Sequence, residues 1–173
     1  MHLSPPAIAL SLALLAVSSV GHGQRRDADV LPASAALTTE GKALFAAQKY
    51  DEAVGVLESA LAVDPRNRAA FVALAQVSAK QGLPGKAIRF YREALLIEPN
   101  DVVALGGQGE AMVQRGAVTK AQENLARIKQ LCAATCAEQE KLAAVIARGA
   151  PVKEVSAQAV QPKPVVTEVP KAQ

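Results

Sequence analysis

The chain has 173 residues and a net charge of +3, which arises from 19 basic and 16 acidic residues. Half of the residues are apolar, but only 3% are aromatic and none is Trp, so the apolar content is mostly Ala, Leu and Val and favours close-packed helices. This composition excludes a collagen, a disulfide-dense miniprotein and a fully disordered chain. Because no stacking aromatic residues accompany the small positive charge, we expect no nucleic-acid binding.

The first segment of the chain is typical of a secretory signal peptide. Residues 7–20 form an uncharged, largely apolar stretch that is shorter than the roughly 20 residues of a membrane-spanning helix but suits the apolar region of a signal. Cleavage is expected after Gly23, or after Gly21 as a second choice; a retained anchor and a buried cytosolic helix are the alternatives. We therefore expect a signal peptide over 1–23, a linker over 24–33 and a secreted, periplasmic protein.

The central part of the chain repeats itself every 34 residues. Ala53, Ala87 and Ala121 share this spacing, and Pro65 and Pro99 keep it. Other columns with the same spacing are Gly41, Ala75 and Gly109; Leu57, Tyr91 and Leu125; and Leu37, Phe71 and Leu105. Apolar residues recur at helical intervals within each copy, and a period of this size is typical of a helical repeat array.

The best-matching stretch runs from Gly41 to Pro65 and reads GKALFAAQKYDEAVGVLESALAVDP. It resembles the tetratricopeptide repeat family, with small residues at Gly41, Ala53 and Ala60 and a closing Pro65. The resemblance implies an all-α fold: three helix–turn–helix repeats stacked as a right-handed superhelix, then a C-terminal cap helix. The repeats are expected over 34–67, 68–101 and 102–135, and the cap helix over 137–148. The sequence departs from the family pattern in lacking Trp, in Pro84 and in Ala133 at the third closing position.

Residues that favour helix ends agree with these boundaries. Asn67 and Asp101 stand just before helical patterns and are good N-caps, and Ser34 is placed to cap the first helix. After the cap helix, Gly149 and four prolines among Val, Lys, Gln and Glu break helices and bury little surface. We expect a disordered Pro/Val-rich tail over 149–173, which either is solvated or docks onto a partner or onto the protein's own groove.

The residue inventory argues against an enzyme. Loss of residues 1–23 would remove both histidines, and with them the commonest general base and most zinc sites. Gly106, Gly107 and Gly109 look like a phosphate loop, but no Lys-Ser/Thr follows them, and their place inside a helical pattern predicts helix packing. We expect no catalytic residue, no metal and no cofactor.

The two cysteines lie four residues apart, between the third repeat and the cap helix. An exported chain with an even cysteine count favours a disulfide between Cys132 and Cys136. Two free thiols, and a redox or metal role, are the alternatives. Because so short a loop gains little entropy in the unfolded state, such a bond would be a local clip.

The family resemblance also implies a concave groove, lined by the first helix of each repeat, in which a partner peptide binds. Carried over to this sequence, the groove consists of Thr38, Lys42, Phe45, Val72, Gln76, Lys80, Glu110, Val113 and Gln114, together with Ala35, Ala46, Ala69, Ala79, Val103 and Gly106. Phe45 has the alternative of packing between the helices of its own repeat. Lys42 and Lys80 lack the Asn partners of the carboxylate clamp in chaperone-binding members, so an acidic C-terminal peptide is not predicted.

The sequence therefore predicts a protein-interaction module, an adaptor or assembly factor of the periplasm or cell envelope. Its groove would bind a peptide or helix of a partner protein whose identity the sequence does not give. No stable membrane insertion is expected after signal cleavage. The alternative is a structural subunit of a larger envelope complex or a homo-oligomer.

Overall fold

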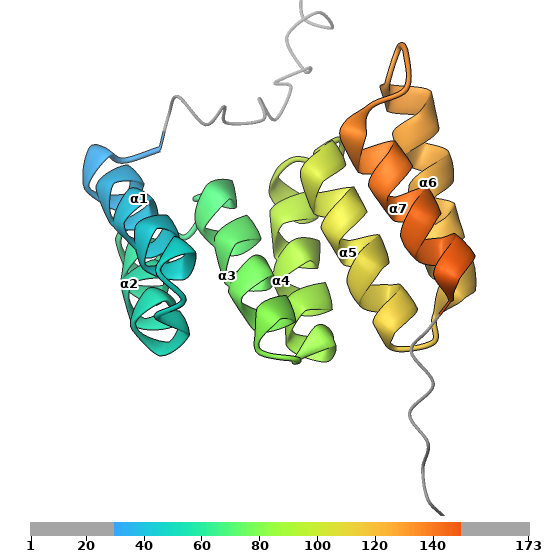
Figure 1. The fold of residues 1–173 in the computed structure, drawn as a ribbon. Coiled ribbons are helices and arrows are strands. Elements are labelled where there is room, and N and C mark those ends of the chain that lie inside the picture. The colour runs from blue at the N-terminus through green and yellow to red at the C-terminus, as the bar shows by residue number, and fades with distance from the viewer. Residues whose placement is uncertain (1–29, 150–173) are drawn as a thin grey trace, which may run out of the picture.

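The structure, a computed structural model, describes residues 30–149. Within that range the chain forms seven α-helices and no strand (Figure 1). They are α1 (Pro32–Ala46), α2 (Tyr50–Val63), α3 (Arg68–Lys80), α4 (Pro84–Ile97), α5 (Val102–Gln114), α6 (Val118–Leu131) and α7 (Ala137–Arg148). The all-α fold predicted from the sequence is confirmed, and α7 occupies the residues of the predicted cap helix.

The helices form three antiparallel pairs followed by a single helix. α1 packs on α2, α3 on α4 and α5 on α6, while α7 packs against both α5 and α6. Contacts between α1 and α3, α3 and α5, and α5 and α7 join the odd-numbered helices into one row, which lies in front of the even-numbered helices in Figure 1. We call the side formed by α1, α3, α5 and α7 the A face.

Two predicted N-caps are confirmed and one is wrong. The Asn67 side chain accepts a hydrogen bond from the backbone of the third residue of α3, at 3.1 Å, and Asp101 caps α5 in the same way. Ser34 lies inside α1, because Pro32 is pre-organised for the first helical position and starts the helix there. The buried Ser34 hydroxyl instead donates to the carbonyl of Ala60, at 2.7 Å, and joins α1 to α2.

Each of the three pairs turns through a residue with left-handed backbone geometry. Gly82 and Gly116 adopt φ values of 73° and 78°, and Gln48 adopts 61° at the equivalent place in the first pair. Only glycine takes this conformation without a steric penalty from its Cβ. The first turn is therefore the strained one.

Small residues of the repeat columns lie where the helices meet. Ala53, Ala87 and Ala121 are fully buried between paired helices. A Cβ on Gly41 would lie 2.5 Å from Cγ of Leu57, and a Cβ on Gly109 would lie 2.7 Å from a methyl carbon of Leu142. Without side chains at these glycines, α1 approaches α2 closely and α7 docks onto α5.

Cys132 and Cys136 bracket the turn between α6 and α7 and pack against the core formed by α5, α6 and α7. Their sulfur atoms lie at bonding distance and their Cα atoms are 6.2 Å apart, within the range of protein disulfides. The described residues contain no helix that is long and apolar enough to cross a membrane, and no group of three or more potential metal ligands. The predicted signal peptide and all but the first residue of the predicted tail lie outside the described residues.

Candidate functional site

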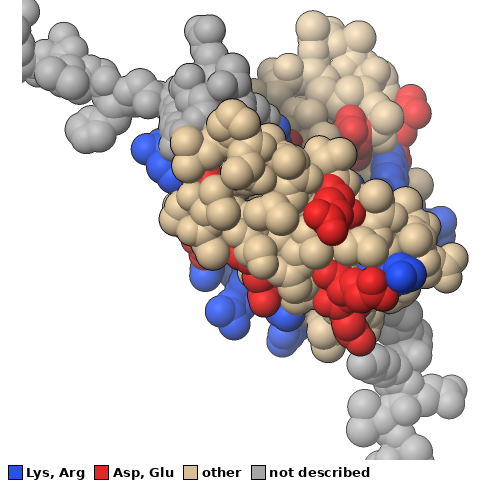
Figure 2. Space-filling view, turned by 90° about the vertical axis from the view of Figure 1, so that its left-hand side faces the viewer, with Lys and Arg blue, Asp and Glu red and all other residues tan. Residues whose placement is uncertain are grey.

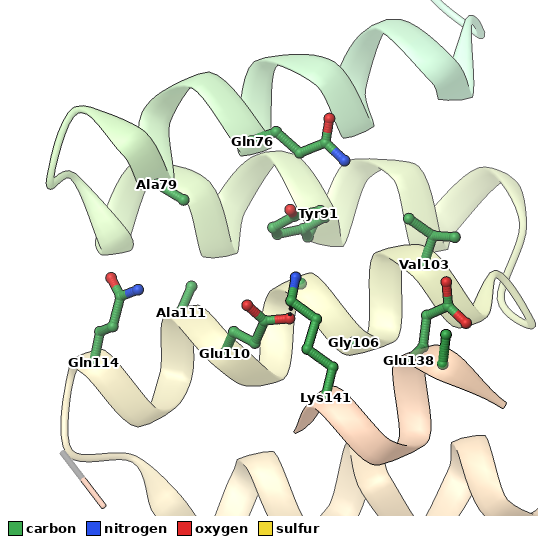
Figure 3. Close-up of a pocket in the computed structure, with 12 residues that line it drawn as sticks. Gln76, Ala79, Tyr91, Val103, Gly106, Glu110, Ala111, Gln114, Glu138 and Lys141 are labelled. Carbon is green, nitrogen blue, oxygen red and sulfur yellow. Dashed lines mark ion pairs between the residues drawn. The ribbon is translucent and has the colours of Figure 1, made fainter. Parts of the chain in front are cut away.

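The A face carries a pocket of about 290 Å³ between α3, α5 and the first turns of α7 (Figure 3). Its lining consists of Gln76, Ala79, Tyr91, Val103, Gly106, Gly107, Glu110, Ala111, Gln114, Ala137, Glu138 and Lys141. Most of these residues come from the odd-numbered helices. Tyr91 is the exception, because it projects from α4 and reaches the A face between α3 and α5.

Glycines on α5 give the pocket its shape. A Cβ on Gly107 would overlap the hydroxyl end of the Tyr91 ring, and one on Gly106 would come within 3.4 Å of Cβ of Glu138. Tyr91 therefore reaches the A face because α5 has no side chain at Gly107, whereas a Cβ at Gly106 would make an ordinary contact with Glu138. The glycine run that the sequence placed in helix packing is confirmed in that role, and it also forms the floor of the pocket.

Tyr91 is 4% exposed, and its hydroxyl makes no hydrogen bond within the described part of the chain. Every fully buried side-chain nitrogen or oxygen in the described range has a hydrogen-bond partner. The Tyr91 hydroxyl is therefore open to the pocket, which is where the close-up shows it (Figure 3). Burial, and after it the carboxylates of Glu110 and Asp101, raise the pKa of Tyr91 far above its usual value, so the hydroxyl stays neutral.

Three charged side chains border the pocket. Nζ of Lys141 on α7 lies 2.9 Å from Oε1 of Glu110 on α5. Glu138, one helical turn before Lys141, is half-buried and forms no ion pair or hydrogen bond with another described residue. Gln76 on α3 and Gln114 at the end of α5 also line the pocket, and their amides have no hydrogen-bond partner among residues 30–149. The pocket thus combines one paired carboxylate, one unpaired carboxylate, a neutral hydroxyl and two amides.

A second, smaller pocket of about 230 Å³ lies where α1 meets the start of α3. Thr38 and Lys42 border it. The Thr38 hydroxyl donates to the carbonyl of Ser34, at 2.8 Å, and accepts from the Asn67 amide, at 2.8 Å. With both bonds made and 4% of its surface exposed, Thr38 belongs to the polar contacts that join the first two repeats.

The structure separates the residues predicted to share one groove. Gln76, Glu110 and Gln114 line the pocket between α3, α5 and α7, whereas Thr38 and Lys42 border the smaller pocket. Lys80, the last residue of α3, is exposed and lines neither.

Three apolar members of the predicted groove pack onto the core instead. Val72 and Val113 are 8% and 1% exposed, which corrects the prediction that they line a groove. Both side chains point toward neighbouring helices, and the apolar residues of those helices cover their methyl groups. Phe45 is half-buried and stacks at an angle on Tyr50 of α2, with ring centroids 5.9 Å apart, as the alternative interpretation of this residue expected.

Sequence reasoning missed Tyr91, Glu138 and Lys141 as site residues. Tyr91 stood in a column with Leu57 and Leu125, and its hydroxyl in an otherwise apolar column was the available signal. Glu138 and Lys141 stand in the predicted cap helix, where charged residues are typical of a solvated outer face. Nothing in their spacing indicates that α7 continues the row of the odd-numbered helices.

These helix pairs, with their 34-residue spacing, match a known family. The family profile described as tetratricopeptide repeat matches residues 38–102, from within α1 to the first residue of α5. Residues 38–102 thus belong to the tetratricopeptide repeat family. No curated protein sequence matches it.

Solved structures similar to this chain include several peptide complexes. The Sgt2 TPR domain from Aspergillus fumigatus is 21% identical, with a TM-score of 0.63, and the match covers 83% of this chain and 92% of that one. The first TPR of Spaghetti (RPAP3), bound to the HSP90 peptide SRMEEVD, is 18% identical with a TM-score of 0.62, and the match covers 67% and 92% of the two chains. The Yersinia enterocolitica type III secretion chaperone SycD, in complex with a peptide of the translocator YopD, is 18% identical with a TM-score of 0.58, covering 66% and 86%. At these identities the likeness shows the fold.

Proposed function

We propose that this protein is an interaction module that binds a peptide or helix of a partner protein on its A face. The main support is the pocket between α3, α5 and α7. The Tyr91 hydroxyl opens into this pocket and has no hydrogen-bond partner among the described residues. A preformed hollow with a few convergent polar groups is the usual form of a binding site. The peptide complexes of Spaghetti and SycD support the assignment, because both proteins share the fold.

We propose further that the protein acts outside the cytoplasm, in the periplasm or cell envelope, as an adaptor or assembly factor. The apolar stretch over 7–20 and the small residues after it support export. The cysteine pair at bonding distance also suits an oxidising compartment.

Selection of a phage-displayed library of random peptides on the full chain tests the binding function. Peptides synthesised from the enriched sequences are then titrated against two variants. Val103→Trp places a large ring at the mouth of the pocket, whereas Val63→Trp places it at the end of α2, off the A face; the two valines are 41% and 40% exposed. Val103→Trp should weaken binding by about tenfold or more, as expected for obstruction of a central anchor site. Absence of any enriched peptide, or equal affinities of the two variants, would reject the proposal.

A second candidate function is self-assembly through the first repeat. Viewed from the α1–α2 end, much of the surface is uncharged (Figure 2). α1 exposes Ala33, Ala36 and Ala43, and Leu31 just before it is 47% exposed. Terminal repeats of an array usually carry a polar outer face, as α7 does with Glu140 and Arg148. Sedimentation of the mature protein tests this function, since a chain that remains a monomer at high concentration contradicts it.

A further inference from the structure

Building on the proposed function, we propose that the pocket between α3, α5 and α7 receives a cationic side chain, Arg or Lys, of the bound partner. In this assignment the Glu138 carboxylate pairs with the cation, and the Tyr91 hydroxyl accepts one of its N–H groups. The partner peptide is thereby defined by a basic residue that enters the pocket and small or apolar residues that lie beside it along the A face.

The Tyr91 hydroxyl is the first observation. It belongs to a side chain that is more than nine-tenths buried, points into the pocket and has no hydrogen-bond partner. Gly107 holds it there, because any side chain at that position would overlap the ring. A phenol offers lone pairs to a donor, so the arrangement supplies an acceptor that no residue within 30–149 uses.

The charge around the pocket is the second observation. Glu110 and Glu138 contribute two negative charges to the lining and Lys141 contributes one positive charge. Lys141 is paired with Glu110, so the Glu138 carboxylate has no counter-ion among the residues that the structure describes. Burial is the main cause of the raised pKa of Tyr91, and the carboxylates of Glu110 and Asp101 add to it with the sign that a negative potential at the hydroxyl produces.

Lys141 already places an ammonium group in this site. Its side chain is 68% exposed, whereas that of Glu110 is 23% exposed. An ion pair with so exposed a member contributes little stability and exchanges readily. A cation from a partner can therefore compete with Lys141, and an Arg can in addition bind a carboxylate in a bidentate manner. An acidic group would instead meet an unpaired carboxylate, which disfavours it.

The test compares variants that are expected to change the affinity for one peptide in opposite directions. The probe is a synthetic peptide with the most enriched sequence from the random library, together with an analogue in which Gln replaces each Arg and Lys. Glu138→Gln should lower the affinity for the basic peptide by about tenfold, because a charge-assisted contact is lost. Lys141→Met should raise this affinity by about threefold, because the competing ammonium group of the protein is removed. Glu123→Gln on α6 is the control, because it removes an exposed carboxylate that does not line the pocket.

Tyr91→Phe keeps the ring that packs on Gly107 and removes only the hydroxyl. It should reduce the preference for the basic peptide over its Gln analogue while thermal melting stays that of the wild type. The same melts establish that the other variants are folded. The assignment is supported if basic peptides are enriched and the two charge variants act in opposite directions as stated.

Five other outcomes overturn the assignment. Enriched peptides that bind the pocket without Arg or Lys, or that bind more weakly to Lys141→Met, would show that the pocket receives another chemistry while the proposed function holds. If no peptide is enriched, the proposed function itself fails and this assignment fails with it. If Glu138→Gln converts a dimer into a monomer, the occupant is a second copy of the chain. If the same change shifts the amide resonances of residues 150–173 in the free protein, the occupant is the protein's own tail.

Discussion

Replacing Gly41 by Ala tests the close approach of α1 and α2. The added Cβ would lie 2.5 Å from Cγ and 2.6 Å from Cδ2 of Leu57, which is fully buried. Ala is favoured over Gly inside a helix by about 1 kcal/mol, whereas overpacking of a core costs about 1–3 kcal/mol. We expect the free energy of unfolding to stay level or fall by as much as about 2 kcal/mol.

Gly55 provides the matched control, because it lies in the middle of α2 and a Cβ there would meet no atom within 4 Å. Gly55→Ala should raise the free energy of unfolding by about 1 kcal/mol. The helix-propensity gain is common to both variants, so the difference between them, about 1–3 kcal/mol, isolates the contact with Leu57. Urea denaturation followed by circular dichroism measures it. Equal stabilisation by the two changes would refute the packing of α1 on α2 described here.

Other predictions concern the first turn, the core and the exported chain. Gln48→Gly should stabilise the protein by up to about 1 kcal/mol, because it removes the Cβ from a left-handed residue; destabilisation in a thermal melt would contradict this. Ala87→Leu should lower the free energy of unfolding by about 1–3 kcal/mol in denaturant melts. A loss below about 0.5 kcal/mol would mean that α3 and α4 do not meet at Ala87. Thiol counting on denatured, unreduced exported protein should find Cys132 and Cys136 blocked; two free thiols would reject the bond. The intact mass of the same material should lack residues 1–23, and a full-length mass would exclude cleavage.

The helical array was predictable because its signals are local and repeated. The 34-residue columns depend on close contacts between paired helices, which need small residues at fixed positions such as Ala53 and Ala87. The start of α1 was misplaced because Ser34 is a good capping residue, and the sequence alone does not show that its hydroxyl bonds across to α2.

The candidate site was predictable only in part, because it depends on how neighbouring repeats pack. Gln76 and Glu110 could be assigned to the A face from the family's pattern. Val113, three residues after Glu110, instead faces the core, since a one-dimensional pattern does not fix which side of α5 the next helices cover. Tyr91 enters the site from the helix row behind it, through the gap at Gly107, and such a contact appears only in three dimensions.

The central claim is that the A face binds the partner, and mapping of amide chemical shifts tests it most directly. An isotope-labelled sample is titrated with the peptide enriched from the library. The account predicts that the largest shifts cluster at residues lining the pocket between α3, α5 and α7, including Gln76, Gly107 and Lys141. Shifts confined to exposed residues of α2, α4 and α6, with these amides unmoved, would contradict it.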